Sequence, residues 1–433
     1  MKFDQGPKPT NKIGRALRFN PHRIYILGLG NLGKYIAYSL KNFNRDAPVR
    51  MIIPNAALHK KFAKDPRIIY QHYDGVTRYT SHDLSSTGLN ISRHIKNLII
   101  STHPSQAASA IKQLRPMLGS DSDVLFLQQG FGVMEDVLKL WPYKSKRPNF
   151  WTGLCRAKIT TPPGGGDFTI YHEKPGPLEI GPIFEGIGGR LKPRSTEEEK
   201  AEEEEEEEDS NKVKSETQEL PYLIQQLVGT PSLDVRILPS KVMYLNQLEK
   251  LAIQAVLHGT AGLFGCPIGQ LRDNSERQRI LSLITDEVCQ VIYALRPEGK
   301  LGSGYGNIRY KLLPKNLKTL LNSQIAEQEN NHSLLQKWEP VRHRNPNEKN
   351  YPTELNNGLS LEDVTGYVVR KGNELGVPVP NNEIMLEMLR AGRTLKYKQA
   401  DRFFYVQKNW QEGGLEPSVE LPPRRWRERQ WSW

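Results

Sequence analysis

Residues 24–33 read IYILGLGNLG, a short apolar run that leads directly into three glycines. Gly28, Gly30 and Gly33 have the spacing G-x-G-x-x-G, and a helix-like stretch, Lys34–Leu40, follows them. Each glycine has a separate role in such a segment: a tight turn, close approach of a pyrophosphate, and close packing of the helix on the strand. The pattern predicts a strand, a phosphate-binding loop and a helix whose free N–H groups face an anion. The alternative is a tight strand–helix turn without a ligand.

Apolar runs recur after this loop, with helical patterns between them. Such an alternation predicts an α/β domain: a doubly wound parallel sheet with helices on both faces, as in a Rossmann fold. The predicted strands are Ile24–Leu27, Val49–Ile53, Leu98–Ser101 and Val124–Leu127, and the clearest helical pattern is Ser105–Leu114. The stretch Trp151–Ile183 differs, because alternating residues around Pro162–Asp167 indicate antiparallel strands joined by a glycine-rich loop. We assign residues 23–190 to this domain.

The second half of the chain has helical periodicity from about residue 221 onward. The expected helices are Val242–Leu263, Glu276–Tyr293, Leu359–Leu375 and Asn382–Ala391, and residues 300–350 are polar and irregular. A low-complexity acidic insert at 191–219 separates the halves, and its like charges predict a disordered, solvated loop. The sequence thus predicts a basic extension at 1–22, the α/β domain, the insert, a mostly helical substrate domain at 220–410 and an Arg/Trp-rich tail at 411–433.

The charge of the chain points to acidic partners. The 433 residues are enough for two cores, and they have a net charge of +12. Without residues 197–209 the rest has 59 basic against 37 acidic residues, a balance of +22. Such a surface attracts nucleic acid, an anionic membrane, or a phosphorylated cofactor and an acid substrate. No apolar run approaches the roughly 18 residues that a membrane-spanning helix needs.

The cysteines indicate a reducing compartment. Cys155, Cys266 and Cys289 lie far apart in the sequence and fit neither a metal site nor a disulfide framework. Residues 1–23 have six basic side chains against Asp4 alone, which is compatible with a mitochondrial targeting segment. Pro7, Pro9 and the lack of a clear apolar face weaken that interpretation, so the sequence leans toward a cytoplasmic location.

The end of the chain mixes arginines with tryptophans. Pro422–Trp433 places four arginines among three tryptophans. Arginines interleaved with aromatic rings stack on bases in single-stranded nucleic acid. A tail that packs its tryptophans on the body of the protein is the more common outcome, and we prefer it.

The segment Leu248–Gly259, LEKLAIQAVLHG, is the second informative stretch. The apolar face of a helix expected to pack into a core is formed by Leu248, Leu251, Ala252, Ala255 and Val256. Lys250, Gln254 and His258 recur every four residues, so at about 3.6 residues per turn they form one narrow polar stripe. Taken alone, this spacing slightly favours a solvated face that bears a lysine.

At this stripe the chain resembles the ketopantoate reductase family (2-dehydropantoate 2-reductases). The second domain of that family opens with the pattern K-L-A-x-N-x-x-x-N, and this chain reads KLAIQ from Lys250 and then His258. Leu127–Asp136, LQQGFGVMED, is similar to the family's x-N-G-x-G-x-x-E. Gly366–Glu383, GYVVRKGNELGVPVPNNE, is similar to N-G-Y-V-x-x-x-x-x-x-G-I-P-x-P-x-N. The chain is therefore identified as a divergent, fungal-type member. This implies a Rossmann domain followed by an all-α domain like the C-terminal domain of 6-phosphogluconate dehydrogenase.

The resemblance implies an NADP-dependent oxidoreductase that passes a hydride from NADPH to the ketone of a 2-oxo acid. The expected reaction converts 2-dehydropantoate to pantoate, as in pantothenate biosynthesis. Lys250 stands at the position of the catalytic lysine, which stabilises the alkoxide and supplies its proton. A homodimer is compatible with the family, and no metal is implied. The implied cofactor contacts are Gly28, Leu29, Gly30, Asn31, Leu32, Gly33, His103 and Gln129, and the implied substrate contacts are Gln129, Gln254, His258, Thr353 and Ser360.

The end of the second predicted strand bears on the choice of cofactor. NAD enzymes usually have Asp or Glu there, hydrogen-bonded to the ribose hydroxyls. This chain has Pro54 and Asn55, and then His59, Lys60 and Lys61. Because no carboxylate repels a 2′-phosphate, the sequence predicts NADP(H). Lys60 or Lys61 would replace the arginine that the family usually has at this strand end.

The chain departs from the family pattern at several implied contacts. Gln129, Gln254 and His258 replace asparagines, His103 replaces a lysine, and Ser360 stands where the family has a glutamate. A glutamine keeps the amide group but moves it by a methylene, and a shift of about 1 Å can cost on the order of 10²-fold in rate. These changes are compatible with a different substrate or with no reaction.

A non-catalytic role is the alternative to the reductase. The chain is also similar to fungal cytochrome b translational activators, which have the same fold, at Gln247–Leu251 and Arg147–Phe150. The partner would then be RNA or the mitochondrial ribosome, since RNA affinity comes largely from neutralised phosphates. RNA binding does not require three fingerprint glycines together with Lys250, so we favour the reductase.

Overall fold

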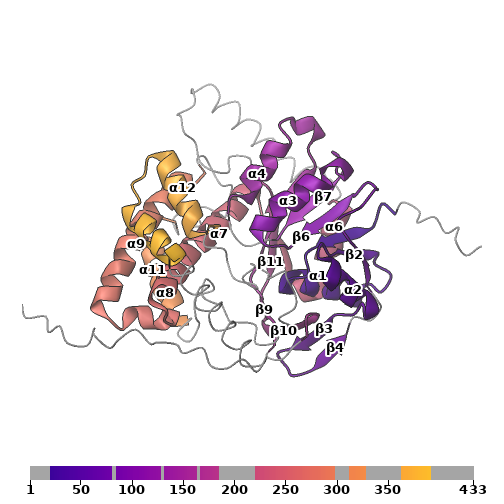
Figure 1. The fold of residues 1–433 in the computed structure, drawn as a ribbon, viewed down its shortest axis with the longest axis horizontal. Coiled ribbons are helices and arrows are strands. Elements are labelled where there is room, and N and C mark those ends of the chain that lie inside the picture. Colours follow the sequence, from indigo (N-terminus) through magenta and orange to yellow (C-terminus); the bar gives the residue numbers. More distant parts are fainter. Residues whose placement is uncertain are drawn as a thin grey trace, which may run out of the picture.

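The computed structural model describes residues 20–79, 84–127, 131–162, 166–184, 220–297, 312–327 and 362–391. The chain forms an α/β half and a helical half, and helix α7 (Ser240–Ile253) lies between them (Figure 1). Residues 1–19, the acidic insert and the Arg/Trp-rich tail lie outside the described residues.

An eight-stranded sheet forms the centre of the α/β half, in the order β12-β11-β8-β7-β6-β1-β2-β5. The strands from β8 to β5 are parallel and have the doubly wound order. In contrast, β11 runs antiparallel to β8 and pairs with β12. The strands are β1 (Ile24–Leu27), β2 (Val49–Ile52), β5 (Ser85–Thr87), β6 (Asn97–Ile100), β7 (Asp123–Phe126), β8 (Asn149–Cys155), β11 (Leu178–Pro182) and β12 (Val235–Ile237). The parallel sheet expected from the sequence is thus confirmed.

Both faces of the parallel strands are buried. Because side chains alternate along a strand, Ile24 and Ile26 of β1 join one core, and Tyr25 and Leu27 join the other. The first core includes α1 (Asn31–Phe43), α2 (Ala56–Lys64) and α6 (Tyr222–Val228), and the second includes α3 (Pro104–Leu114) and α4 (Val133–Leu140). A sheet covered on both faces leaves its strand ends as the place for ligands.

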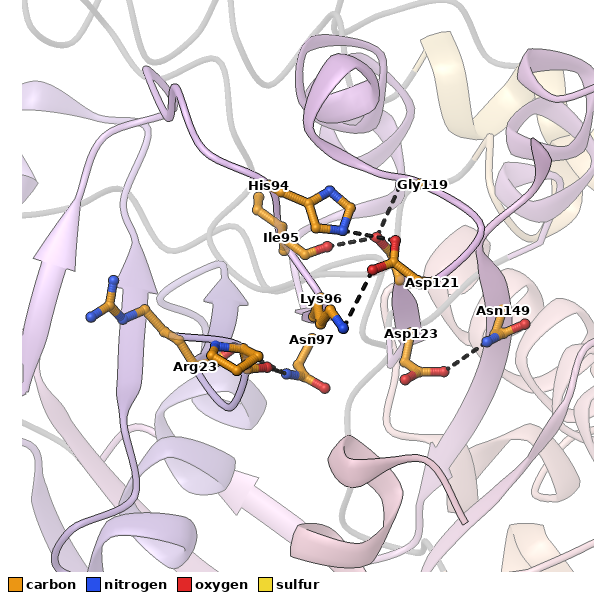
Figure 2. A network of polar contacts seen from close by, with 11 residues as sticks. Arg23, His94, Ile95, Lys96, Asn97, Gly119, Asp121, Asp123 and Asn149 are labelled. Carbon is orange, nitrogen blue, oxygen red and sulfur yellow. Dashed lines mark hydrogen bonds and ion pairs between the residues drawn. The ribbon is translucent and has the colours of Figure 1, made fainter. Parts of the chain in front are cut away.

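A polar network fixes the amino ends of β6, β7 and β8 (Figure 2). His94 Nε2 and Lys96 Nζ lie 2.8 and 3.5 Å from the two carboxylate oxygens of Asp121. Burial opposes the charge of Asp121, but its contacts with His94 and Lys96 outweigh this effect and hold the pKa below its ordinary value. On the next strand Asn149 donates to Asp123 Oδ1 at 3.2 Å. The network stabilises the edge of the sheet opposite the glycine loop.

A second, four-stranded sheet has the order β4-β3-β10-β9. Its strands are β3 (Ile69–His72), β4 (Thr77–Tyr79), β9 (Lys158–Thr160) and β10 (Thr169–Lys174). β9 and β10 are the antiparallel pair expected around the glycine-rich loop, and β10 also pairs in parallel with β3, which the sequence did not predict. Lys34 of α1 donates to the carbonyl oxygens of Asp167 and Thr169 at 3.0 and 3.3 Å, and so connects this sheet to the glycine loop.

The helical half packs around one apolar core. Its helices are α7, α8 (Gly259–Phe264), α9 (Ser275–Leu295), α11 (Pro314–Glu327), α12 (Thr365–Leu375) and helical residues 380–391. The expectation that residues 300–350 are irregular was wrong for α11, which buries Leu317, Leu321 and Ile325 and exposes a polar face. The segment from 221 onward also contains the strand β12, which the sequence did not predict. Its position depends on pairing with β11, far away in the chain, and not on a local hydrophobic period. No helix of the described residues is long and apolar enough to cross a membrane.

Candidate functional site

The glycine loop joins β1 to α1 at the carboxyl edge of the large sheet. Gly28 has a φ of +110°, and a Cβ there would lie 2.9 Å from the backbone nitrogen of Thr102. A Cβ on Gly33 would lie 2.5 Å from the carbonyl oxygen of Gly28. The tight turn and the close helix–strand packing predicted from the spacing are therefore both present.

The first turn of α1 suits an anion. Gly30 is the N-cap, its backbone receives no side-chain cap, and the first turn has no acidic residue. Leu29 and Leu32 pack on the core, so these residues offer a ligand their backbone only. The amide of Asn31 accepts a hydrogen bond from the hydroxyl of Thr161 at 3.0 Å. Uncapped N–H groups behind a glycine-rich loop fit the pyrophosphate of a dinucleotide.

His103 follows β6, the strand beside β1, and faces the helical half. Its carbonyl oxygen accepts the N–H groups of Gln106 and Ala107 at the start of α3. Its Nε2 lies 3.8 Å from Asp363 Oδ2. The backbone N–H of Phe131 also donates to the carbonyl of Asp363, at 3.0 Å. Phe131 in the loop after β7 and His103 in the loop after β6 thus both contact Asp363, in the segment that precedes α12.

Lys250 lies in the last turn of α7, which packs against β8 and β11. One turn earlier, Asn246 Nδ2 donates to Glu179 Oε2 of β11 at 3.2 Å. Residues four apart share one face of a helix, and Lys250 interacts electrostatically with Cys155, Arg156 and Glu179. Since β1 and β8 are parallel strands of one sheet, the glycine loop and Lys250 lie along the same carboxyl edge, where open α/β sheets bind ligands.

The pKa of Lys250 is lowered to about 8. Desolvation is the largest cause; the charge of Arg156 lowers the pKa further, whereas Cys155 and Glu179 act in the opposite direction. The side chain remains partly exposed, and its ammonium group has no hydrogen bond or ion pair with another described residue. An amine that changes charge near neutral pH and keeps its donors available is suited to general acid catalysis.

A π-helical turn interrupts the predicted polar stripe. Gln254–His258 form this turn between α7 and α8, and its i→i+5 hydrogen bonds change the angular spacing of the side chains. The expectation of a regular stripe with a four-residue repeat was therefore wrong beyond Ile253. Gln254 and His258 are both buried, with 4% and 6% of their surfaces exposed. Such turns occur frequently at functional sites.

Three predicted contacts lie outside the described residues: Gln129, Thr353 and Ser360. The structure brings together the glycine loop, His103 and Lys250 along one edge and places Gln254 and His258 in the turn that follows Lys250. The contacts of all these residues with cofactor and substrate stay predictions.

Sequence reasoning missed a buried ion network that joins the two halves. Glu135 of α4 accepts a hydrogen bond from the hydroxyl of Tyr367 at 2.7 Å and lies 2.7 Å from Lys371 Nζ. The Lys371 side chain is 8% exposed and also lies 2.7 Å from Glu374. Burial opposes the charge of Lys371, but the two carboxylates keep its pKa above the ordinary value. Glu135 is the last but one residue of the LQQGFGVMED stretch, and its place in this family-like pattern was the available sequence signal.

The GVPVPNNE part of the third family-like stretch has a structural role. Asn382 is fully buried, and its backbone N–H and Nδ2 donate to Glu287 Oε2 at 2.9 and 2.7 Å. Asn381 donates to the other oxygen of the same carboxylate through its N–H and Nδ2, at 2.9 and 2.6 Å. Glu287 of α9 thereby fixes the start of helical residues 380–391.

A Rossmann domain, a helical domain and a lysine between them define the class of protein. The chain belongs to the ketopantoate reductase family, whose members are NAD(P)H-dependent reductases that use small 2-oxo acids. Residues 24–184 match the description "Ketopantoate reductase PanE/ApbA", and residues 243–393 match the C-terminal domain of that family.

Individual relatives are distant. The chain is 27% identical over 287 residues to a probable 2-dehydropantoate 2-reductase of Schizosaccharomyces pombe, which covers 63% of this chain and 73% of the relative. It is 23% identical over 433 residues to a ketoisovalerate reductase of Beauveria bassiana, covering 87% and 84%. The structure of a probable 2-dehydropantoate 2-reductase from Bacillus subtilis superposes with a TM-score of 0.57 at 14% identity, covering 85% of this chain and 99% of that one. At this identity the structural likeness shows the fold alone.

Proposed function

We propose that the protein is an NADPH-dependent reductase of a branched 2-oxo acid, with 2-dehydropantoate as the first candidate. The observation that carries this proposal is Lys250, whose ammonium group has a lowered pKa, has no hydrogen bond or ion pair with another described residue, and lies on the edge that also holds the glycine loop. Curated relatives named as 2-dehydropantoate and ketoisovalerate reductases support a branched 2-oxo acid.

The chain's own residues then have defined tasks. NADPH, when bound, supplies the hydride for the ketone carbon. The backbone of Gly28–Gly33 and the start of α1 hold the pyrophosphate. The ammonium group of Lys250 donates a hydrogen bond to the ketone oxygen, stabilises the negative charge that develops there and transfers its proton to it. A pKa of about 8 keeps most of the lysine protonated at neutral pH. It also makes the lysine a stronger acid than an ordinary lysine.

We assign the 2′-phosphate to the end of β2. The side chain of Asn55 accepts the N–H of Leu58 at 2.9 Å and caps α2, and Lys61 pairs with Asp167 at 2.6 Å. Lys60 is exposed and has no polar contact with another described residue, so it is the lysine available for a phosphate. This strand end lacks the carboxylate that would bind the ribose hydroxyls and favour NADH instead.

The test measures consumption of NADPH or NADH by the purified protein with 2-dehydropantoate and with ketoisovalerate. We expect turnover with NADPH, and Lys250→Ala to lower kcat/KM by about 10²–10⁴-fold. Binding of NADPH, followed by fluorescence titration, should change little in this variant. Lys241→Ala, in the first turn of the same helix, is the matched control and should keep its activity. A protein that neither binds NADPH nor consumes it with either acid would overturn the proposal.

A further inference from the structure

We propose that Arg156 receives the carboxylate of the substrate beside Lys250 and thereby makes the site specific for 2-oxo acids. This inference rests on the proposed function and goes beyond it, because it names the group that selects the acid.

The backbone at Arg156 is firmly placed at the carboxyl end of β8. Its N–H donates to the carbonyl of Pro177 at 2.9 Å. A Cβ on Gly176 would lie 2.6 Å from the carbonyl carbon of Arg156. The turn at Gly176 therefore packs against Arg156 more closely than a residue with a side chain would allow. The arginine therefore projects from a fixed point on the edge that holds the glycine loop.

The side chain of Arg156 is oriented through one oxygen of Glu179. Nε and Nη2 of the arginine lie 3.3 and 3.2 Å from Oε2, and Asn246 of α7 donates to the same oxygen at 3.2 Å. The Glu179 side chain is 14% exposed, whereas the Arg156 side chain is 33% exposed. A guanidinium has five N–H donors, and Nη1 has no hydrogen bond to another described residue. One edge of the arginine is thus held by Glu179, and the other is open to a ligand.

The net positive charge of Lys250, Arg156 and Glu179 together favours the binding of an anion. Lys250 and Arg156 are cationic, and Glu179 supplies one negative charge. Burial raises the pKa of the Cys155 thiol, so Cys155 opposes the effect of Arg156 on Lys250 only at a pH high enough to ionise the thiol. The two cations repel each other, as the effect of Arg156 on Lys250 shows. A bound carboxylate would neutralise the remaining positive charge, and arginine is the side chain that matches a carboxylate with paired hydrogen bonds.

The connectivity of a 2-oxo acid fits this pair of cations. Its carboxylate carbon is bonded directly to the ketone carbon, so the groups that receive the ketone oxygen and the carboxylate must be neighbours. Lys250 at the end of α7 and Arg156 after β8 are such neighbours, and Asn246–Glu179 connects their two elements. The same anion favours the charged form of Lys250, so substrate binding keeps the proton donor protonated.

The decisive experiment compares ketoisovalerate with its methyl ester, which has the same ketone but no charge. In Arg156→Gln we expect kcat/KM for the acid to fall by about 10- to 100-fold, with the value for the ester within about threefold of wild type. Arg156→Lys should recover part of the loss. Arg236→Gln is the matched control: it lies beside Glu179 in the sheet register, but its guanidinium pairs with Asp234 at 3.2 Å, and it should leave both substrates unaffected.

A second measurement does not depend on turnover. The rate at which trinitrobenzene sulfonate labels Lys250, followed by peptide mass mapping against pH, reports the protonation of this amine. We expect ketoisovalerate to slow the labelling in wild type and to lose this effect in Arg156→Gln, even if no NADPH is consumed. Equal loss of activity on acid and ester, or protection that persists without Arg156, would refute the assignment. Failure of the proposed function alone would instead show as protection without turnover.

Discussion

Two lysines of this protein have the same lowered pKa but different hydrogen-bond partners. Lys34 and Lys250 both have a pKa of about 8, and desolvation is the main cause in each case. The Lys34 ammonium group donates to two backbone carbonyls, and its role is to join α1 to the small sheet. Lys250 has no such partner among the described residues. A lowered pKa therefore points to chemistry only where the amine also keeps its donors available.

The pH dependence of activity follows from Lys250. Because the protonated amine is the acid, kcat/KM should be level at neutral pH and fall about tenfold per pH unit well above the pKa, which is about 8. Arg156 lowers this pKa, so Arg156→Gln should move the descending limb to higher pH. The measurement is a pH–rate profile of both proteins with the same 2-oxo acid. A wild-type profile that stays flat to about pH 10, the range of an ordinary lysine, would contradict the assigned role.

At the scale of helices and strands, the sequence predicted the elements that depend on interactions between residues close together in the chain. The unit of β1, glycine loop and α1 depends on contacts within a few residues, and the glycine spacing and apolar periods describe it fully. The pairing of β3 with β10 joins Tyr70 to Ile170 and similar partners about a hundred residues apart, for which no local pattern exists. The π turn at Gln254–His258 was missed because its apolar residues also fit an α-helix.

The packing of α1 on β1 gives a prediction for this unit. Gly33→Ala places a methyl group 2.5 Å from the carbonyl oxygen of Gly28, so the helix must shift, and unfolding should become easier by roughly 1–3 kcal/mol. Gly30→Ala is the matched control, since a Cβ there would lie 3.6 Å from its nearest neighbour, the carbonyl oxygen of Ser101. It should unfold like wild type yet bind NADPH more weakly, because the pyrophosphate approaches the loop at this position. Urea unfolding and NADPH titration separate the two effects, and equal stability of both variants would argue against the packing role.

At the scale of the molecule, the candidate site depends on how the two halves meet. Glu135 and Tyr367 are 232 residues apart in the chain, and each lies in a stretch that the sequence singled out. The sequence could indicate both stretches through their family-like patterns, but it contains no signal that they touch. The contact of Phe131 with Asp363 and the ion network of Glu135 with α12 place the loop that precedes α4 against the helical half. The geometry of the site is thus a property of the assembled chain.

The ion network gives the last prediction. Glu135→Gln leaves the buried ammonium of Lys371 with Glu374 alone, and the loss of a buried charged hydrogen bond should lower the free energy of unfolding by about 1.5–3 kcal/mol. Glu374→Gln is the matched control, because it removes the other partner of the same lysine. That partner is 51% exposed and lies on the same helix, so its loss should cost at most about 1 kcal/mol.

Urea unfolding measures both values, and NADPH consumption at a fixed temperature shows whether the site depends on the contact. If the network positions the two halves, kcat/KM should fall in Glu135→Gln and not in Glu374→Gln. Equal effects of the two substitutions would mean that the lysine needs only one carboxylate of either origin, and that the halves are held together by their apolar contacts.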